Sequence, residues 1–154
     1  MTVFLSDEQD QPADLAGLKA VAEGTLRAEG LPDGTELAVM LVTPDQIAEY
    51  NARFMHRSGP TDVLAFPLED LEPGSVPSLR LNDPPLALGD VFLCPAEIGR
   101  RADKERLDAQ AFLFLLLVHG ILHLLGYDHH DDESAKRMEA REDEILTSLG
   151  RPLP

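Results

Sequence analysis

Short apolar runs, separated by turn-forming residues, characterise the first two-thirds of the chain and predict strands. The run 37–42 is apolar throughout and lies between turn signals, which is typical of a buried strand. Three other runs are as short and are rich in valine, leucine and phenylalanine. We therefore expect four strands, at residues 2–5, 37–42, 63–66 and 91–94.

Apolar residues at helical spacing predict an amphipathic helix over residues 14–29, and Gly30 is the expected stop. Thr43 is a suitable cap for a second helix, because Pro44 follows it at the first helical position. This second helix is expected to run to about Phe54. The two helices lie between the predicted strands, so the first half of the chain mixes both kinds of element.

From Pro95 onward the pattern is helical, and its centre is the strongly apolar stretch 111–118. A membrane span needs about 20 consecutive apolar residues. Two histidines interrupt this apolar run, and it stops at Gly126. We therefore expect a central core helix rather than a membrane span. A last helix is expected between the acidic residues 131–133 and Gly150.

Residues 67–87 hold five of the twelve prolines, together with glycine, serine and several acids. We expect a long, mobile loop here rather than a linker, because neither flank is large enough for a core of its own. The length of the chain suits one domain, 1–154. Strands followed by helices predict an α+β fold, in which a small sheet packs on the buried central helix.

The sequence is strongly acidic, since 13 lysines and arginines face 28 aspartates and glutamates and the net charge is −15. Such a surface repels a phosphate polymer unless a basic patch or a metal offsets it, so composition alone argues against nucleic acid. A well-solvated surface explains the acidity. Cys94 is the only cysteine, which excludes an internal disulfide and fits a reducing compartment. The N-terminus does not resemble a secretory signal, and we expect a cytoplasmic protein.

Four of the five histidines fall within residues 119–130. His119 and His123 are four residues apart, so on a helix both imidazoles project from one face and can bind one ion. Gly126 can end the helix in a left-handed conformation and turn the chain back, which would bring His129 to the same ion. Three imidazoles with one open position are typical of a zinc site that activates water.

The same spacing of three histidines and a glycine occurs in the metzincin proteases. Those enzymes carry a glutamate as general base directly after the first histidine, whereas this chain has Gly120. The pattern therefore predicts the ligands of a hydrolytic zinc enzyme without the base of a peptidase. His130 is expected beside the site rather than as a ligand, and His56 lies apart in the sequence.

Three sequence blocks resemble the YbeY family, the bacterial endoribonucleases of ribosomal RNA maturation. Residues 119–129 read HGILHLLGYDH and are similar to the family's HGxLHLxGYDH signature. Residues 59–67 read GPTDVLAFP and are similar to its PTDVLSFP strand, and residues 88–95 read LGDVFLCP and are similar to its LGD strand. The resemblance covers roughly residues 40–148, and the N-terminal third adds little.

This resemblance implies a single-domain α+β fold with a small mixed sheet, and one zinc ion bound by His119, His123 and His129. It also implies a single-strand-specific endoribonuclease that acts in maturation of the small-subunit (16S) ribosomal RNA and in ribosome quality control. The implied partners are precursor ribosomal RNA and a ribosomal particle or its proteins. Neither a membrane nor DNA is expected among the partners.

The chain departs from the family at two positions. An arginine that many members carry before the Pro-Thr pair is here Met55, and the serine of the strand block is Ala65. Arg57 and Arg53 are the nearby cations that could replace the arginine as contacts for the RNA phosphate. Asp128 is a second catalytic candidate beside Arg57, because it is next to the expected ligand His129 and could orient a histidine or position water. A turn-forming role for this aspartate is equally consistent with the sequence.

A basic run precedes the central helix, with Arg100, Arg101, Lys104 and Arg106 interleaved with acids. We interpret it as a salt-bridged helix face rather than a phosphate site. Two alternatives to the nuclease remain open: a zinc metallopeptidase-like hydrolase, and a non-catalytic ribosome assembly factor with structural zinc. A structural site would need a fourth protein ligand, for which Cys94 and His130 are the candidates. The attacking group, water or the 2′-hydroxyl of the RNA, also stays open.

Overall fold

The computed structural model describes residues 1–154 and contains four strands and five helices. The order along the chain confirms the predicted α+β class, with strands and helices mixed at first and helices alone at the end. The elements are β1 (Thr2–Asp7), α1 (Leu15–Ala28), β2 (Thr35–Leu41), α2 (Pro44–Met55), β3 (Val63–Pro67), β4 (Leu86–Leu93), α3 (Pro95–Glu105), α4 (Ala109–Leu124) and α5 (Asp132–Ser148).

The four strands form one mixed sheet in the order β1-β2-β4-β3. β2 pairs in parallel with β1 and with β4, because α1 and then the longer α2–β3 segment carry the chain back between them. β3 pairs antiparallel with β4 and forms one edge of the sheet. The mixed sheet that the family resemblance implies is therefore confirmed. β3 is an edge strand of this sheet, and it contacts α4.

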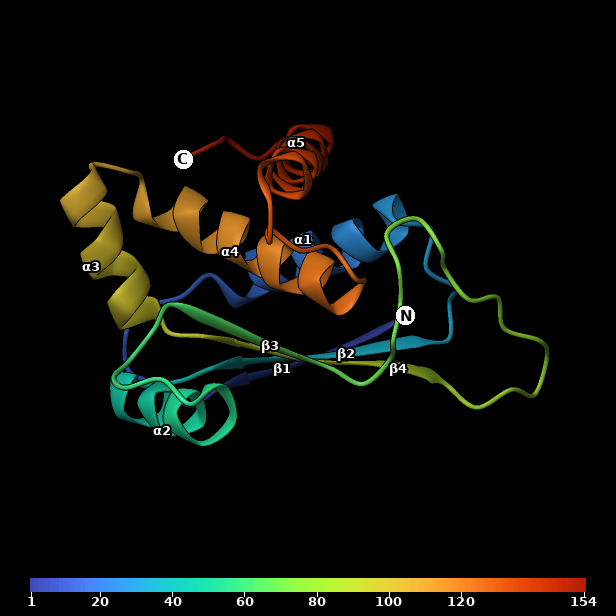
Figure 1. Ribbon diagram of the computed structural model, residues 1–154, viewed down its shortest axis with the longest axis horizontal. Helices are drawn as coiled ribbons and strands as arrows, with labels where there is room; N and C mark the ends of the chain where they lie inside the picture. The colour runs from blue at the N-terminus through green and yellow to red at the C-terminus, as the bar shows by residue number, and fades with distance from the viewer.

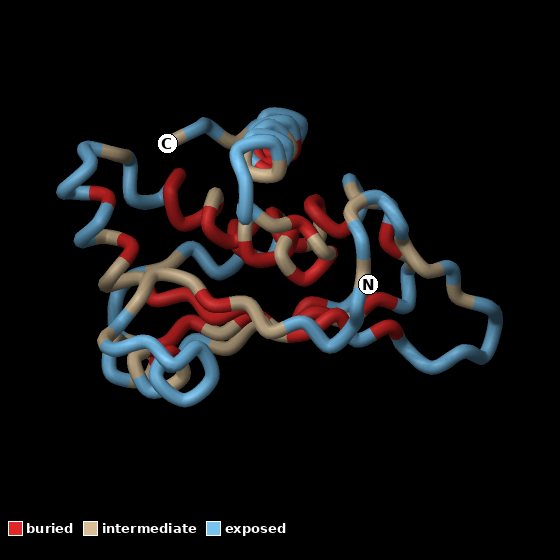
Figure 2. The backbone as a smooth tube through the Cα atoms, viewed as in Figure 1, coloured by how far each residue is buried: buried red, intermediate tan, exposed pale blue.

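The sheet lies between layers of helices (Figure 1). α1 and α4 cover one face, α2 covers part of the other face, and α5 lies on the side of α4 that points away from the sheet. The buried residues gather in α4, α1 and the strands, whereas the outer side of α5 is exposed (Figure 2). α4 is therefore the central helix of the core, as its apolar sequence predicts.

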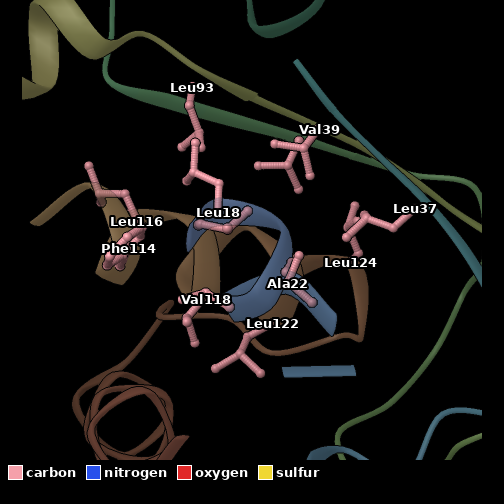
Figure 3. Close-up of a cluster of buried hydrophobic side chains, with 14 of the residues drawn as sticks. Leu18, Ala22, Leu37, Val39, Leu93, Phe114, Leu116, Val118, Leu122 and Leu124 are labelled. Carbon is pink, nitrogen blue, oxygen red and sulfur yellow. The ribbon is translucent and has the colours of Figure 1, made fainter. Parts of the chain in front are cut away.

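The main core forms where α1 and α4 meet the sheet. Figure 3 shows Leu18 and Ala22 of α1 between α4 and the strand residues Leu37, Val39 and Leu93, whereas Val118 and Leu122 of α4 lie on the side away from the strands. A smaller cluster around Ile47 and Phe92 lies on the other face, under α2. α4 buries side chains in several directions, so its two histidines are the polar exceptions on an otherwise apolar helix.

β4 is longer than the sequence predicts. It begins at Leu86 rather than at residue 91, because Leu86 and Ala87 continue the parallel ladder with β2 before a shift in register. Gly89 and Asp90 interrupt the apolar pattern at this shift, so the sequence shows only the second half of the strand. The segment between β3 and β4 is therefore 68–85, and its expected mobility stays a prediction.

The helical region after residue 94 is divided into α3 and α4, which are bent by 118° relative to each other. Arg106 ends α3 in a left-handed conformation, with φ of 57°. No single helix is long and apolar enough to cross a membrane; only α3 and α4 taken together, across their bend, reach that length and composition. Cys94, predicted as the last residue of a strand, precedes the first turn of α3.

Candidate metal centre and its groove

His119 and His123 project from the C-terminal half of α4. Asp108 caps the start of the helix, since its carboxylate accepts a hydrogen bond from the backbone N–H of Ala111, and packing of the apolar surface of α4 fixes the position of the helix. The Nε2 atoms of the two histidines lie 3.1 Å apart. Both side chains are half-buried, so the core holds two imidazoles side by side at its edge.

His129 reaches the same point through a sharp turn after α4. Gly126 has a φ of +95°, which favours glycine, and a Cβ atom there would lie 2.0 Å from the carbonyl oxygen of Leu71. The turn therefore needs glycine for its backbone conformation and for the close approach of the segment after β3. One ring nitrogen from each of the three histidines lies within 4.8 Å of the other two.

The three histidines fit a metal ion. In a tetrahedral site with zinc–nitrogen distances of about 2.0–2.1 Å, two ligand nitrogens lie about 3.3 Å apart. The separation of 3.1 Å between His119 and His123 is close to that value. No other group of histidine, cysteine, aspartate or glutamate in the chain converges in this way. The arrangement can therefore hold one ion and leaves a position for a further ligand.

Neither candidate for a fourth protein ligand belongs to this group. Cys94 is fully buried at the start of α3, and burial raises the pKa of its thiol, which disfavours the thiolate that binds metals. His130 is exposed, and its Nε2 lies 3.5 Å from a carboxylate oxygen of Asp128. A site with three protein ligands is the usual form of a catalytic zinc centre, whereas structural centres are closed by four.

Two of the histidines have partners for their second ring nitrogen. Nδ1 of His119 lies 3.3 Å from a carboxylate oxygen of Glu142, and Nδ1 of His123 lies 3.0 Å from the carbonyl oxygen of Tyr127. Both acceptors call for a proton on Nδ1, which leaves Nε2 free to bind a metal. Each partner therefore fixes the tautomer and the orientation of one ligand.

Glu142 is the residue of the site that the sequence analysis missed. Its carboxylate is buried, with 5% of the residue exposed, and it comes from α5, 23 residues after the histidine that it contacts. One local signal exists. Glu142 is in helical register with the buried residues Met138 and Leu146, so it is an acid within the apolar stripe of α5.

Burial and the neighbouring imidazoles determine the charge of His123. Burial, and after it the proximity of His119 and His129, lowers its pKa from 6.5 to about 4. The ring is consequently neutral at neutral pH, which is the form that binds a metal.

The other predicted site residues separate into two groups. Arg57 is exposed and lines a groove together with the three histidines, and Met55 lines the same groove. Arg53 lies outside that lining, with its guanidinium 5.5 Å from the ring centroid of Phe54. His56 is also outside, as the residue that ends α2. Of the two arginines, the structure therefore brings Arg57 to the histidines.

Asp128 contacts its neighbour rather than a ligand. Its carboxylate accepts a hydrogen bond from the backbone N–H of His130 at 3.3 Å, a contact typical of a turn-forming aspartate. Asp128 is not the acceptor for His119 or His123, because Nδ1 of each already contacts another oxygen, from Glu142 and from the Tyr127 carbonyl respectively.

The groove has two halves, which meet at the histidines and have Asp62, Val63, His119 and His129 in common. The first, here called the Arg57 lobe, has a volume of about 570 Å³ and is also lined by Asn51, Met55, Arg57, Thr61, Leu64, Ala65, Pro67, His123 and His130. The second, here called the α5 lobe, has a volume of about 580 Å³ and is also lined by Arg101, Phe112, Leu115, Leu116, Ala135, Met138, Glu139, Glu142 and Asp143.

The basic run on α3 is a salt-bridged helix face, as predicted. Arg100 pairs with Glu97, and Arg101 lies 3.4 Å from Glu105. The sequence does not reveal a third pair, in which Arg101 reaches Asp62 at 2.6 Å across 39 residues. This pair places one cation and one anion where the two lobes meet.

Gly120 faces the sheet and not the groove. A Cβ atom at this position would lie 2.7 Å from Cγ1 of Val91 on β4. The position that carries the general base of a metzincin is therefore occupied by the contact between α4 and the sheet. A glutamate side chain there would meet Val91.

Comparison with known proteins identifies one family. A family model described as "Endoribonuclease YbeY" matches residues 5–150. A relative named "Endoribonuclease YbeY" from Thermobifida fusca is 38% identical over 153 residues, covering 99% of this chain and 97% of the relative. One of the same name from Acidothermus cellulolyticus is 38% identical over 149 residues, covering 96% and 91%. A solution structure of a Thermotoga maritima protein is similar with a TM-score of 0.65 and 28% identity, covering 96% of this chain and 88% of that one.

Proposed function

Because the chain belongs to the YbeY family of endoribonucleases, we propose that it is a zinc-dependent endoribonuclease that cleaves single-stranded RNA. We assign it to the maturation of the small-subunit (16S) ribosomal RNA and to ribosome quality control. The family match spans nearly the whole chain, so the complete fold and not a fragment of it is shared.

The convergence of His119, His123 and His129 is the observation that carries this proposal. When bound, zinc would supply a Lewis acid that stabilises negative charge on the cleaved phosphate and would make water more acidic. Glu142 and the carbonyl of Tyr127 hold the two helical ligands in the orientation that binding needs. The groove on either side of the cluster is open to solvent, which an extended RNA strand requires.

Arg57 is the residue that we propose to contact the RNA phosphate. It is the only lysine or arginine in the lining of the Arg57 lobe. A guanidinium can donate two parallel hydrogen bonds to one phosphate, so it can hold the phosphodiester and neutralise part of its charge. Met55 cannot supply this charge, and Arg57 therefore takes over the role of the family arginine. Asp128 stays a candidate for positioning water, with the turn contact as its alternative role.

The acidity of the chain bears on its partners. With a net charge of −15, the surface outside the groove repels RNA. We propose that precursor ribosomal RNA is presented by a ribosomal particle, in the cytoplasm, so that contacts with the particle offset this repulsion. Cleavage is then expected to be more efficient on a precursor particle than on the same RNA free in solution, and this difference should persist at low salt.

An RNase assay tests the proposed function. Purified, zinc-loaded protein should cleave single-stranded RNA, and activity should disappear with a chelator and return with added zinc. A His119→Ala, His123→Ala double variant, purified in parallel, controls for contaminating nucleases. Activity that survives in this variant, or no cleavage of free or particle-bound RNA by the folded wild type, would contradict the proposal. The second result would leave the non-catalytic assembly role.

An oligonucleotide with a single 2′-deoxy nucleotide identifies the attacking group. If water attacks the phosphorus, cleavage continues at the bond after the deoxy nucleotide. If the adjacent 2′-hydroxyl attacks, cleavage stops at that bond only and continues elsewhere. The remaining bonds of the same oligonucleotide are the internal control.

A further inference from the structure

The α5 lobe does not have the chemistry of a phosphate site. Glu139 and Asp143 of α5 lie at its rim and are exposed, and Asp62 lies where it meets the Arg57 lobe. Neither rim carboxylate forms a salt bridge, unlike Glu144 on the same helix, which pairs with Arg141 at 3.0 Å. The one arginine of the lobe, Arg101, is already paired with Asp62. A phosphate in this lobe would meet an excess of negative charge.

The floor of the α5 lobe is apolar. Phe112, Leu115 and Leu116 of α4 face Met138 of α5, and Val63 of β3 closes the side next to the histidines. Near the junction of the two lobes the guanidinium of Arg101 lies 5.1 Å from the ring centroid of Phe112. A flat, uncharged group is suited to such a floor. A sugar phosphate would instead place polar and charged atoms against apolar side chains that offer them no hydrogen bonds.

We propose that the α5 lobe binds one nucleobase of the RNA strand, and that the base it accepts carries an exocyclic amino group. This inference rests on the proposed endoribonuclease function. The strand's phosphate would lie at the histidines and Arg57, and the adjoining base would enter the lobe on the other side of His119. A pocket of about 580 Å³ is large enough for one base, since small-molecule pockets occupy roughly 300–1,000 Å³.

The acidic rim gives the lobe its preference. Carboxylates accept hydrogen bonds and cannot donate them, so Glu139 and Asp143 pair with the amino groups of adenine, cytosine or guanine. Uracil has no amino group and presents a carbonyl oxygen at the corresponding position, which a carboxylate repels. A hydrogen bond to a charged acceptor is stronger than one between neutral groups, so the expected preference is about tenfold.

The four methionines provide a direct test, because Met138 lines the α5 lobe, Met55 lines the Arg57 lobe, and Met1 and Met40 line neither. Zinc-loaded protein labelled with ¹³C at the methionine methyl groups is titrated with nucleosides and followed by NMR. Adenosine should shift the Met138 signal and leave Met40 unchanged, whereas ribose 5-phosphate should shift Met55 and not Met138. The signals are assigned with single Met→Leu variants.

Size-matched pairs of nucleosides separate recognition of the amino group from binding of any base. Adenosine is compared with unsubstituted purine riboside, and cytidine with uridine. The nucleoside with the amino group should bind about tenfold more tightly in each pair. Equal affinities within both pairs, or shifts of Met55 alone, would overturn the proposal.

Cleavage mapping gives a second, independent readout. A uridine oligonucleotide with one central cytidine should be cut mainly at one fixed distance from the cytidine. The variants Glu139→Ala and Asp143→Ala, which remove the acceptors, should lose this selectivity, whereas Glu133→Ala, at an exposed acid of α5 outside the lobe, should keep it. If the carboxylates only repel RNA, both rim variants would instead speed cleavage at every uridine equally, and the proposal would fail.

The two readouts also separate this inference from the proposed function. Nucleoside binding in the α5 lobe without any RNA cleavage would contradict the endoribonuclease and leave the base pocket in place. RNA cleavage with no preference among bases, and no shift of Met138, would leave the endoribonuclease and contradict the pocket.

Discussion

The two lobes of the groove have nearly the same volume and share the histidine cluster, yet they are built differently. The Arg57 lobe is lined largely by the segment between α2 and β3 and by β3 itself, and it contains one arginine beside the histidines. The α5 lobe lies between two helices and combines an apolar floor with an acidic rim. One side therefore suits a phosphate and the other an uncharged base, and a metal centre between them can serve both.

The comparison also shows how a strongly acidic chain can act on RNA. The charge of the whole molecule is repulsive, whereas the charge that matters at the cluster is that of the few groups lining each lobe. Acidic residues are harmful next to a phosphate and useful next to an amino group. The net charge of −15 is therefore a stronger argument against nucleic acid than the charges that line the two lobes.

Loss of the metal ligands is expected to have the largest effect, because the cluster belongs to both lobes. In the variant His119→Ala, His123→Ala the rate of RNA cleavage should fall by more than the about 10²–10³-fold that the loss of one oxyanion donor costs. Bound zinc, measured by elemental analysis, should fall with it. Circular dichroism should confirm an intact fold. A double variant that keeps its zinc would show that other residues bind the metal.

Removal of the Glu142 carboxylate should weaken metal binding from the side of the α5 lobe. Orienting partners of metal ligands typically contribute 10–100-fold to affinity, so Glu142→Ala should lower zinc affinity by about that factor in competition with a chelator. Glu142→Gln retains a carbonyl acceptor for Nδ1 of His119 and should recover part of the loss. Equal zinc affinity in all three proteins would show that Glu142 does not orient His119.

Arg57 should act on one lobe only. Arg57→Ala should raise the KM for single-stranded RNA by about tenfold, as expected for a charged hydrogen bond, and should do so for every base sequence. Arg53→Ala is the matched control and should leave KM unchanged, because Arg53 lies outside the groove. A larger effect of the Arg53 variant would reassign the phosphate contact. A sequence-dependent effect of Arg57→Ala would break the division between the two lobes.

The smallest effect concerns His123, which lines the Arg57 lobe alone. Burial and the neighbouring His119 and His129 hold its pKa at about 4 in the folded chain, against 6.5 for an unperturbed histidine. Between these values the unfolded chain binds the proton more readily, so the stability due to neutral His123 is complete above about pH 6.5 and is lost as the pH falls towards 4.

This linkage can be measured on chelator-treated protein. The Tm of the wild type should fall more steeply below about pH 6.5 than the Tm of His123→Asn, whose amide does not titrate. The Tm of the wild type minus the Tm of the variant should therefore decrease on acidification. A difference that stays constant would show that the imidazole is not held neutral in the folded chain.

Much of the fold and of the metal centre could be predicted from local patterns. The spacing of His119 and His123, the glycine turn and His129 lie within eleven residues, so the geometry of one helix and one turn is enough to bring them together. The α+β class followed in the same way from apolar periodicity. The family resemblance added the mixed sheet, which strand patterns alone do not determine.

The remaining features depend on contacts between distant segments. Glu142 meets His119 and Arg101 meets Asp62 only because helices pack against each other and against the sheet, and no local spacing encodes these meetings. The first half of β4 was missed because Gly89 and Asp90 break its apolar pattern, although the ladder to β2 continues. The α5 lobe has no motif of its own, since it is a space between two helices.

The three ligands are held with unequal firmness. His119 and His123 belong to the core helix and have orienting partners, whereas His129 is exposed and follows the turn at Gly126. Departure of a bound ion should consequently begin at His129, because the turn can move without opening α4. A firmly built core is thus compatible with release of the ion from one side.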